Sequence, residues 1–224
     1  MKLTVFNGSP RGSKGNSEII INWFKEGFLK HGSGEPATLY LKEQKKHRDM
    51  IETVKQSDTV LLVFPLYTDA MPGIVKKFID GLEEHQGLLS GKSFLFMVHS
   101  GFPEACHSRG VERYLKSLTE KLGADYLGTI VKGGSEGFRV MPPMMTKKPR
   151  LLIDKIGEQF ARTKSLDSGL LKKLANPERL LPFSRGMYRL MSLTGLNNFY
   201  WNGMLKKNGA FNNRFDAPYT EDYL

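Results

Sequence analysis

The sequence contains a single cysteine, Cys106, and no long apolar segment. One cysteine excludes an intramolecular disulfide and any multi-cysteine metal site. The apolar run at residues 3–6 is interrupted by residues 7–10 before the apolar region of a signal peptide would be complete. No later run reaches the roughly 18 residues that span a bilayer. We therefore expect a cytoplasmic protein that is not inserted in a membrane.

Acidic residues are in the minority, with 23 Asp and Glu against 33 Lys and Arg and a formal net charge of +10. Residues 141–224 contribute much of this excess, with 14 basic and 7 acidic side chains. Such a charge can attract nucleic acid, an anionic membrane surface or a phosphorylated substrate. The basic residues are scattered and form no blocks, so a solvated surface explains them equally well. No nucleic-acid partner is expected.

Short apolar runs alternate with segments of helical periodicity along most of the chain. The clearest run, residues 60–64, consists of branched and aromatic side chains, which is typical of a parallel strand covered on both faces. Strands are predicted at residues 2–6, 38–41, 60–64, 93–98 and 126–131. Strands joined by helices imply a three-layer α/β fold with a parallel sheet. Ligands of such sheets bind at the carboxyl ends of the strands.

The end of the chain has a different pattern. A final helix is expected at residues 150–162, after a helix-breaking stretch at residues 141–145. The residues beyond it include aromatic, Met, Asn and basic side chains without a strand pattern. We expect residues 1–164 to form the compact domain. Residues 165–224 should form an extension, not an independent domain, that packs on the compact domain or on a second subunit.

The loop at residues 7–17 joins the first strand to the first helix and has the composition of an anion site. Its small residues let backbone N–H groups approach a ligand, and the helix N-terminus adds the positive end of its dipole. Ser9, Asn16 and Ser17 are side-chain donors, and Arg11 can add a charged fork. The spacing matches neither the Walker motif nor the dinucleotide-binding glycine motif, so a nucleoside triphosphatase is disfavoured.

Two further loops follow later strands. The loop after the third strand offers Tyr67 and Met71, whose flat or adaptable apolar surfaces suit an aromatic ligand. The loop after the fourth strand offers Ser100 as a donor and Gly101 for a close backbone approach. The histidine that begins this loop, His99, is more often structural than catalytic when it stands alone.

Together the three loops resemble those of the flavodoxin-like NADPH-dependent FMN reductases and NAD(P)H-dependent oxidoreductases. Gly-Ser-Pro-Arg at residues 8–11, followed by Gly-Asn-Ser at residues 15–17, is similar to the phosphate loop of that family. Pro-Leu-Tyr at residues 65–67, with Met-Pro-Gly at residues 71–73, looks like its second flavin loop. The resemblance covers residues 1 to about 135. It implies a flavodoxin-like three-layer sandwich, with a five-stranded parallel sheet in the order 2-1-3-4-5 and helices on both faces.

The same resemblance implies FMN as cofactor and assigns roles to ten residues. The residues that would hold the FMN phosphate are Ser9, Arg11, Asn16 and Ser17. Those that would line the isoalloxazine ring are Pro65, Leu66, Tyr67 and Met71, and those that would close its other edge are Ser100 and Gly101. No catalytic acid or base is required of the side chains, because the cofactor carries the redox chemistry.

The chain departs from related flavoproteins in two places. Residues 42–48 contain no cysteine, which excludes the iron-sulfur cluster that a related branch carries there. Residues 99–103 differ from the glycine-rich third loop that is common in the family, so the roles of Ser100 and Gly101 are carried over less directly. The resemblance gives no role to residues 165–224.

The expected activity is that of an FMN-dependent NAD(P)H oxidoreductase. It would transfer hydride from a nicotinamide to bound FMN and pass the electrons to a small acceptor, such as a quinone, a nitro compound, a metal ion or a flavin. The main alternative is a flavodoxin-type electron carrier without its own substrate, but such carriers are acidic and this chain is basic. In a third reading, the basic and aromatic tail engages nucleic acid or a membrane. A homodimer is expected as the common default.

Overall fold

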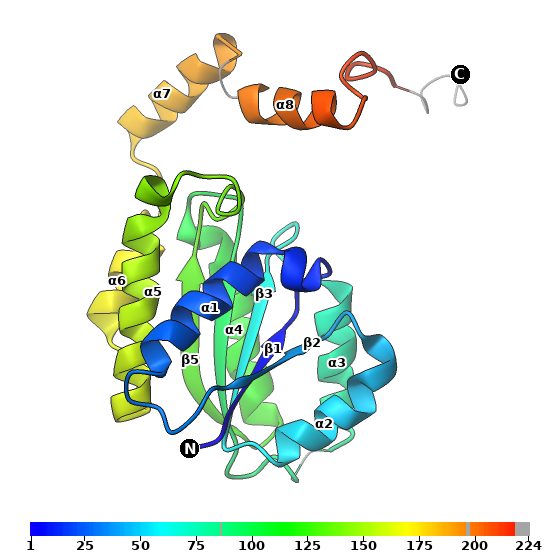
Figure 1. The fold of residues 1–224 in the computed structure, drawn as a ribbon, viewed down its shortest axis with the longest axis vertical. Helices are drawn as coiled ribbons and strands as arrows, with labels where there is room; N and C mark the ends of the chain where they lie inside the picture. The colour runs from blue at the N-terminus through cyan, green and yellow to red at the C-terminus, as the bar shows by residue number, and fades with distance from the viewer. Residues whose placement is uncertain (86, 196–197, 218–224) are drawn as a thin grey trace. The chain divides into compact units, whose positions relative to one another are not determined.

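The computed structural model describes residues 1–85, 87–195 and 198–217. Its centre is a five-stranded parallel sheet in the order β2-β1-β3-β4-β5 (Figure 1). The strands are β1 (Leu3–Asn7), β2 (Ala37–Tyr40), β3 (Thr59–Pro65), β4 (Ser93–His99) and β5 (Asp125–Lys132). This order and the parallel pairing confirm the predicted sheet.

Each central strand sends alternate side chains into two separate cores. In β3, Val60, Leu62 and Phe64 enter one core, whereas Leu61 and Val63 enter the other. All seven residues of β3 are buried. The continuous apolar run that predicted this strand is therefore explained by burial on both faces of the sheet.

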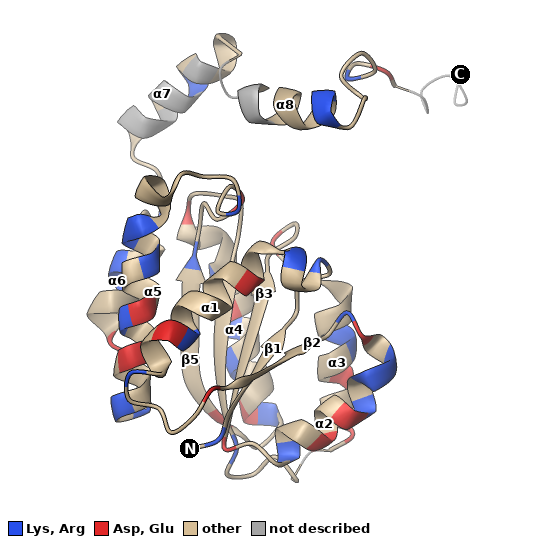
Figure 2. Ribbon diagram, in the orientation of Figure 1, with Lys and Arg blue, Asp and Glu red and all other residues tan. Residues whose placement is uncertain are grey.

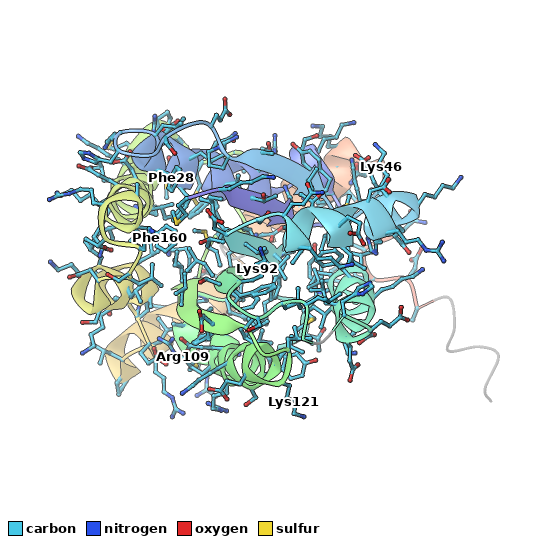
Figure 3. All side chains as sticks on the ribbon, turned by 90° about the horizontal axis from the view of Figure 1, so that it is seen from below. Phe28, Lys46, Lys92, Arg109, Lys121 and Phe160 are labelled. Carbon is cyan, nitrogen blue, oxygen red and sulfur yellow. The ribbon has the colours of Figure 1, made fainter. Side chains whose placement is uncertain are left out.

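Helices cover both faces and connect the strands. They are α1 (Asn16–Phe28), α2 (His47–Lys55), α3 (Gly73–Glu83), α4 (Arg109–Lys121) and α5 (Pro143–Thr163), with short 3-10 turns η1 (Gly12–Lys14), η2 (Gln44–Lys46) and η3 (Ala105–Ser108). One core joins the sheet to α2, α3 and α4, and the other joins it to α1 and α5. Figure 3 shows the two layers from below, with Phe28 and Phe160 on the side of α1 and α5 and Lys121 on the opposite side. The three-layer prediction is confirmed.

The helix α5, expected to be the last one, starts earlier than the sequence pattern indicates and is followed by further helices. A helix was expected from residue 150, but α5 begins at Pro143. Proline is favoured at the first helical position, because its N–H would be unpaired there in any case and its φ suits the helix. The proline-rich stretch at residues 141–145 therefore opens the helix, and the prediction that it breaks the helix is wrong.

The helices α1 and α5 touch through two glycines. A Cβ atom on Gly27 would lie 1.8 Å from the carbonyl oxygen of Asp154, and a Cβ atom on Gly157 would lie 2.2 Å from that of Phe24. Real Cβ atoms do not approach backbone this closely, so only glycine permits the contact. The position of α1, and of the loop that leads into it, is thus set by α5.

The first compact unit of the chain comprises Met1–Arg179. It includes α6 (Ser168–Ala175), which begins where Asp167 Oδ1 accepts a hydrogen bond of 2.7 Å from the N–H of Leu170. Leu174, in the last turn of α6, is buried in the same core as α1 and α5. The domain boundary expected at residue 164 stays a prediction, since the compactness of this unit does not measure independent folding.

The second compact unit, Leu180–Leu224, contains α7 (Pro182–Leu193) and α8 (Phe199–Lys207). Where the structure describes this unit, it contains no strand. The basic and aromatic tail that could engage nucleic acid or a membrane includes Phe183, Tyr188 and Phe199, whose side chains lie outside the described part. No described helix of the chain is long and apolar enough to cross a membrane.

Charged side chains are spread over the outer helices of the first unit. Figure 2 shows Lys and Arg on α2, α5 and α6, with Asp and Glu among them. Several form ion pairs, as Lys30 does with Asp154 and Glu158 at 2.6 and 3.2 Å. This distribution agrees with a solvated basic surface.

Candidate functional site

The loops that follow β1, β3, β4 and β5 line one pocket of about 130 Å³ at the carboxyl edge of the sheet. The pocket is lined by Ser9, Arg11, Asn16, Pro65, Leu66, Tyr67, His99, Ser100, Gly101, Ser135 and Glu136. Eight of the ten residues predicted from the sequence are therefore brought together here. The other two, Ser17 and Met71, do not line the pocket.

A larger hollow, of about 470 Å³, lies at the opposite edge of the sheet. It is lined in part by Lys2, Leu3 and Asp58, which stand at the beginning of β1 and before β3. Parallel sheets bind ligands at the carboxyl ends of their strands. Although this hollow is larger, the pocket at the carboxyl edge of the sheet is therefore the better candidate for the ligand site.

The loop after β1 folds into a compact turn through its own hydrogen bonds. Asn7 Oδ1 accepts from the N–H of Ser9 at 3.0 Å, and Ser9 Oγ accepts from the N–H of Arg11 at 3.2 Å. The N–H of Gly12 bonds the carbonyl of Ser9 at 2.9 Å. Gly12 has a φ of +54°, a conformation that glycine adopts without steric cost. The turn places Ser9 and Arg11 next to the first turn of α1.

Several donors around this turn have no acceptor within the described part of the chain. They are the backbone N–H groups of Asn16 and Ser17 and the guanidinium of Arg11. The hydroxyl proton of Ser9 is likewise unused, since Ser9 Oγ acts only as an acceptor. Free N–H groups at a helix N-terminus, with a cation beside them, form an anion site.

The side chains of Asn16 and Ser17 are used differently from what the sequence suggests. Asn16 Nδ2 donates to the carbonyls of Ser135 and Glu136, at 2.9 and 2.8 Å. Ser17 is buried, and its Oγ lies 2.7 Å from Nε2 of His99. Both side chains therefore tie elements of the fold together, and their backbone N–H groups are what remains for a ligand.

His99 lies at the centre of a buried network. Its Nδ1 is 2.8 Å from Ser135 Oγ, and Ser135 Oγ donates to the carbonyl of Ser100 at 3.0 Å. Ser135 must then accept from Nδ1–H of His99, which leaves Nε2 to accept the proton of Ser17. Complete burial lowers the pKa of His99 to about 3, so the ring is neutral. These contacts support the structural reading of His99.

The loop after β5 was not identified from the sequence. It contributes Ser135 and Glu136 to the pocket, and Arg139 anchors it by donating to the carbonyls of Gly15 and Ser13 at 3.0 and 3.3 Å. The signal was present, because Gly-Gly-Ser follows the fifth predicted strand at residues 133–135. Small residues after a strand of a parallel sheet mark a ligand loop by the same rule that selected the other three.

The loops after β3 and β4 form the other side of the pocket. Tyr67 and Ala70 exchange two backbone hydrogen bonds, of 2.8 and 3.0 Å, and close a turn in which Thr68 and Asp69 have φ of 48° and 59°. Burial, together with the negative charge of Glu136, raises the pKa of Tyr67. Ser100 Oγ donates to the carbonyl of Phe102 at 3.1 Å and so acts toward a ligand only as an acceptor. Met71 packs against the core beneath its loop.

A comparison with protein families identifies the family of the chain. The model of the NADPH-dependent FMN reductase family matches residues 1–131 of the 224-residue chain. The chain belongs to this family. The protein is therefore an NAD(P)H-dependent flavin oxidoreductase with FMN as its cofactor. The matched region ends at residue 131, within β5 and before the loop of Ser135.

Solved structures share the fold at low sequence identity. An NADH:FMN oxidoreductase in its apo form is 14% identical, with a TM-score of 0.57 over 78% of this chain and 95% of the other. An FMN-dependent NADH-azoreductase from Bacillus anthracis, solved with FMN, is 16% identical, with a TM-score of 0.56 over 72% and 100%. A WrbA-like flavodoxin from Agrobacterium tumefaciens is 13% identical, with a TM-score of 0.54 over 72% and 96%. These similarities confirm the flavodoxin-like fold. A search of curated proteins finds no match.

Proposed function

We propose that the FMN phosphate binds to Ser9, Arg11 and the backbone N–H groups of Asn16 and Ser17. The observation that carries this proposal is the set of unused donors at the first turn of α1, beside a positive side chain. A phosphate dianion is stabilised by the dipole of α1 and by a charge-assisted fork from Arg11. The side chains of Asn16 and Ser17 would support the site by holding it together.

The flavin ring is proposed to lie over the loops after β3 and β4. Pro65, Leu66 and Tyr67 supply the apolar surface on one side, and Ser100 with Gly101 forms the other edge. The pocket of about 130 Å³ is smaller than the 300–1,000 Å³ that is typical of sites enclosing a whole ligand. The pocket can enclose one part of FMN, and the rest of the cofactor would lie on the surface beside the pocket. Met71 would support the ring loop from below.

We further propose that the electron acceptor is a small molecule that reaches the ring side of the pocket. Tyr67 is 48% exposed and Phe102 is 47% exposed, so two aromatic side chains border this side. Planar acceptors such as quinones, nitro compounds and free flavins can stack on such rings. The proposal also includes metal ions among the acceptors. The cytoplasmic location and the homodimer stay predictions.

The visible spectrum of the purified protein tests the proposal first. Bound oxidised flavin that is released as FMN is expected, and NADH or NADPH should bleach it under anaerobic conditions. Re-oxidation by each class of acceptor then identifies the substrate. A spectrum that neither nicotinamide changes would refute the proposed turnover.

The phosphate assignment is tested separately by Arg11→Ala, with Lys14→Ala as a matched control. Lys14 is a basic residue of the same loop, but it does not line the pocket. Only Arg11→Ala should weaken FMN binding. Equal losses in both variants would instead indicate a diffuse electrostatic effect.

A further inference from the structure

A cluster of metal-ligating side chains lies just beyond the pocket, in the segment after β4. The ligand atoms of Glu104, Cys106 and His107 all lie within 4.8 Å of one another. Glu104 Oε2 is 3.7 Å from Nε2 of His107. Glu104 is the N-cap of η3, three residues before His107, so both side chains stand at the start of the same 3-10 turn. We propose that these three residues bind a divalent transition-metal ion such as Zn²⁺.

Asp69 orients the histidine of this cluster. Its Oδ1 lies 3.1 Å from Nδ1 of His107, which makes Nδ1 the protonated nitrogen and leaves the lone pair of Nε2 on the side of Glu104. A carboxylate on the far nitrogen of a ligating histidine is the usual outer contact of protein metal sites. Asp69 is itself held in a left-handed turn that the backbone bonds between Tyr67 and Ala70 close.

Contacts outside the cluster fix the ligands in place. The ring of Phe102 stacks on that of His107, with centroids 4.4 Å apart and planes 24° apart. The backbone N–H groups of Ala105 and Cys106 bond the carbonyls of Pro177 and Glu178, at 3.0 and 3.1 Å. The η3 turn is therefore anchored to the segment after α6, and an ion would meet ligands whose backbone is already positioned.

The ligand types select the class of ion. A thiolate, an imidazole and a carboxylate suit Zn²⁺ and its transition-metal neighbours, whereas Mg²⁺ and Ca²⁺ prefer oxygen ligands alone. Three protein ligands leave one tetrahedral position for water or an anion. This site needs only one cysteine, so the cysteine count of the chain does not exclude it.

A bound ion would hold together the segment that follows Gly101, in which all three ligands lie. The hydrogen bond between Asp69 and His107 connects this segment to the loop of Tyr67. Both loops belong to the side that we assign to the flavin ring. This consequence rests on the proposed function, but binding of the ion does not.

The single thiol of the chain gives a direct test. In FMN-loaded protein, Cys106 is the one target of a thiol-selective alkylating reagent, and Zn²⁺ should slow this reaction while Mg²⁺ leaves it unchanged. Calorimetry should find one Zn²⁺ per chain. We expect Cys106→Ser and His107→Ala each to weaken it at least about 100-fold, and Asp69→Asn to weaken it about 10- to 100-fold. His31→Ala, which removes a histidine paired with Glu158 on the surface, is the matched control and should bind as the wild type does.

Alkylation that Zn²⁺ does not slow would overturn the proposal. So would Zn²⁺ affinity that survives in both Cys106→Ser and His107→Ala, or that is lost in His31→Ala. The same measurements on protein freed of FMN separate this proposal from the flavin assignment. If the flavin assignment is wrong, protection of Cys106 by Zn²⁺ is still expected.

Discussion

The side of the pocket formed by the loops after β1 and β5 differs from the side formed by the loops after β3 and β4. On the first side, Asn16 donates a hydrogen bond of 2.9 Å to the carbonyl of Ser135. The neutral imidazole of His99 bonds the hydroxyl groups of Ser17 and Ser135, at 2.7 and 2.8 Å. On the second side, Tyr67 is half exposed and stands at a turn with left-handed residues.

The difference suggests a division of tasks within one site. The first side has buried polar contacts that leave a few donors in fixed positions, as an anion requires. The second side offers accessible aromatic surface, as exchange of planar substrates requires. We expect substitutions on the first side to change cofactor binding and fold stability, and those on the second side to change turnover.

At neutral pH, the largest effect should come from moving α1, on which the first side depends. Gly27→Ala would place a methyl group against the backbone of Asp154 in α5. Overpacking of this kind costs about 1–3 kcal/mol and more against rigid backbone, so we expect a loss of about 3 kcal/mol in the free energy of unfolding, measured by urea denaturation.

Gly110→Ala is the control for Gly27→Ala. Gly110 lies in α4, and its Cβ would meet no atom within 4 Å. Alanine is the better helix former, so this variant should be unchanged or more stable by about 0.5 kcal/mol. Equal stability of Gly27→Ala and Gly110→Ala would contradict the close contact of α1 and α5.

The next largest effect is on FMN binding, and it should differ between substitutions on the two sides of the pocket. Arg11→Ala should weaken FMN binding by about 2 kcal/mol, the scale of a hydrogen bond to a charged group, and leave the reduction rate of the bound cofactor nearly unchanged. Tyr67→Ala should weaken binding by only about 1 kcal/mol, but change the rate of reduction by NAD(P)H. Titration of flavin fluorescence and stopped-flow reduction measure the two quantities. A slower reduction in Arg11→Ala, together with a larger loss of FMN affinity in Tyr67→Ala, would contradict the division of tasks.

The pH dependence of stability tests the network of His99. Its pKa of about 3 lies far below the value of about 6.5 for a histidine in the unfolded chain, so folding disfavours its protonation. The stability due to neutral His99 is complete above about pH 6.5 and falls as the pH drops toward 3, by up to about 1.4 kcal/mol per pH unit. In His99→Gln this slope should be shallower, as urea denaturation at several pH values would show. Parallel curves for the two proteins would mean that His99 is not buried as a neutral ring.

The smallest effect concerns the carboxylate of Glu136 at the pocket. Its negative charge would oppose a phosphate beside Arg11, so Glu136→Gln should tighten FMN binding by about 0.5 kcal/mol, which is the scale of an exposed charge pair. The gain should shrink at high salt. Weaker binding in this variant would instead show that Glu136 accepts a hydrogen bond from the cofactor.

The local pattern of apolar residues predicts much of the fold. The run at residues 60–64 predicted β3 because a strand buried on both faces must be apolar throughout. The start of α5 was misplaced because proline breaks a helix in its interior and favours it at the first position. Whether a proline breaks or starts a helix depends on its distance from the first helical residue. The sequence of residues 141–145 does not show where that first residue lies.

The sequence predicts which loops form most of the candidate site, but it does not predict the hydrogen bonds between them. Composition identified Asn16 and Ser17 as donors, whereas their side chains are bonded to residues 119 and 82 positions away. Such partners are decided by the order in which β1, β3, β4 and β5 lie in the sheet, which no local window contains. The structural role expected for His99 rested on the general behaviour of isolated histidines, and its buried contacts support it.

The glycine contact between α1 and α5 also has a consequence for the order of events during synthesis. The loop proposed to bind phosphate emerges from the ribosome before α5, and Asp154 of α5 follows its contact residue Gly27 by 127 residues. At about 5–20 residues per second, α1 waits roughly 6–25 seconds for the helix that completes its core. The apolar face of α1 is uncovered during that time, so the nascent chain presents a surface for chaperones before it can hold its cofactor.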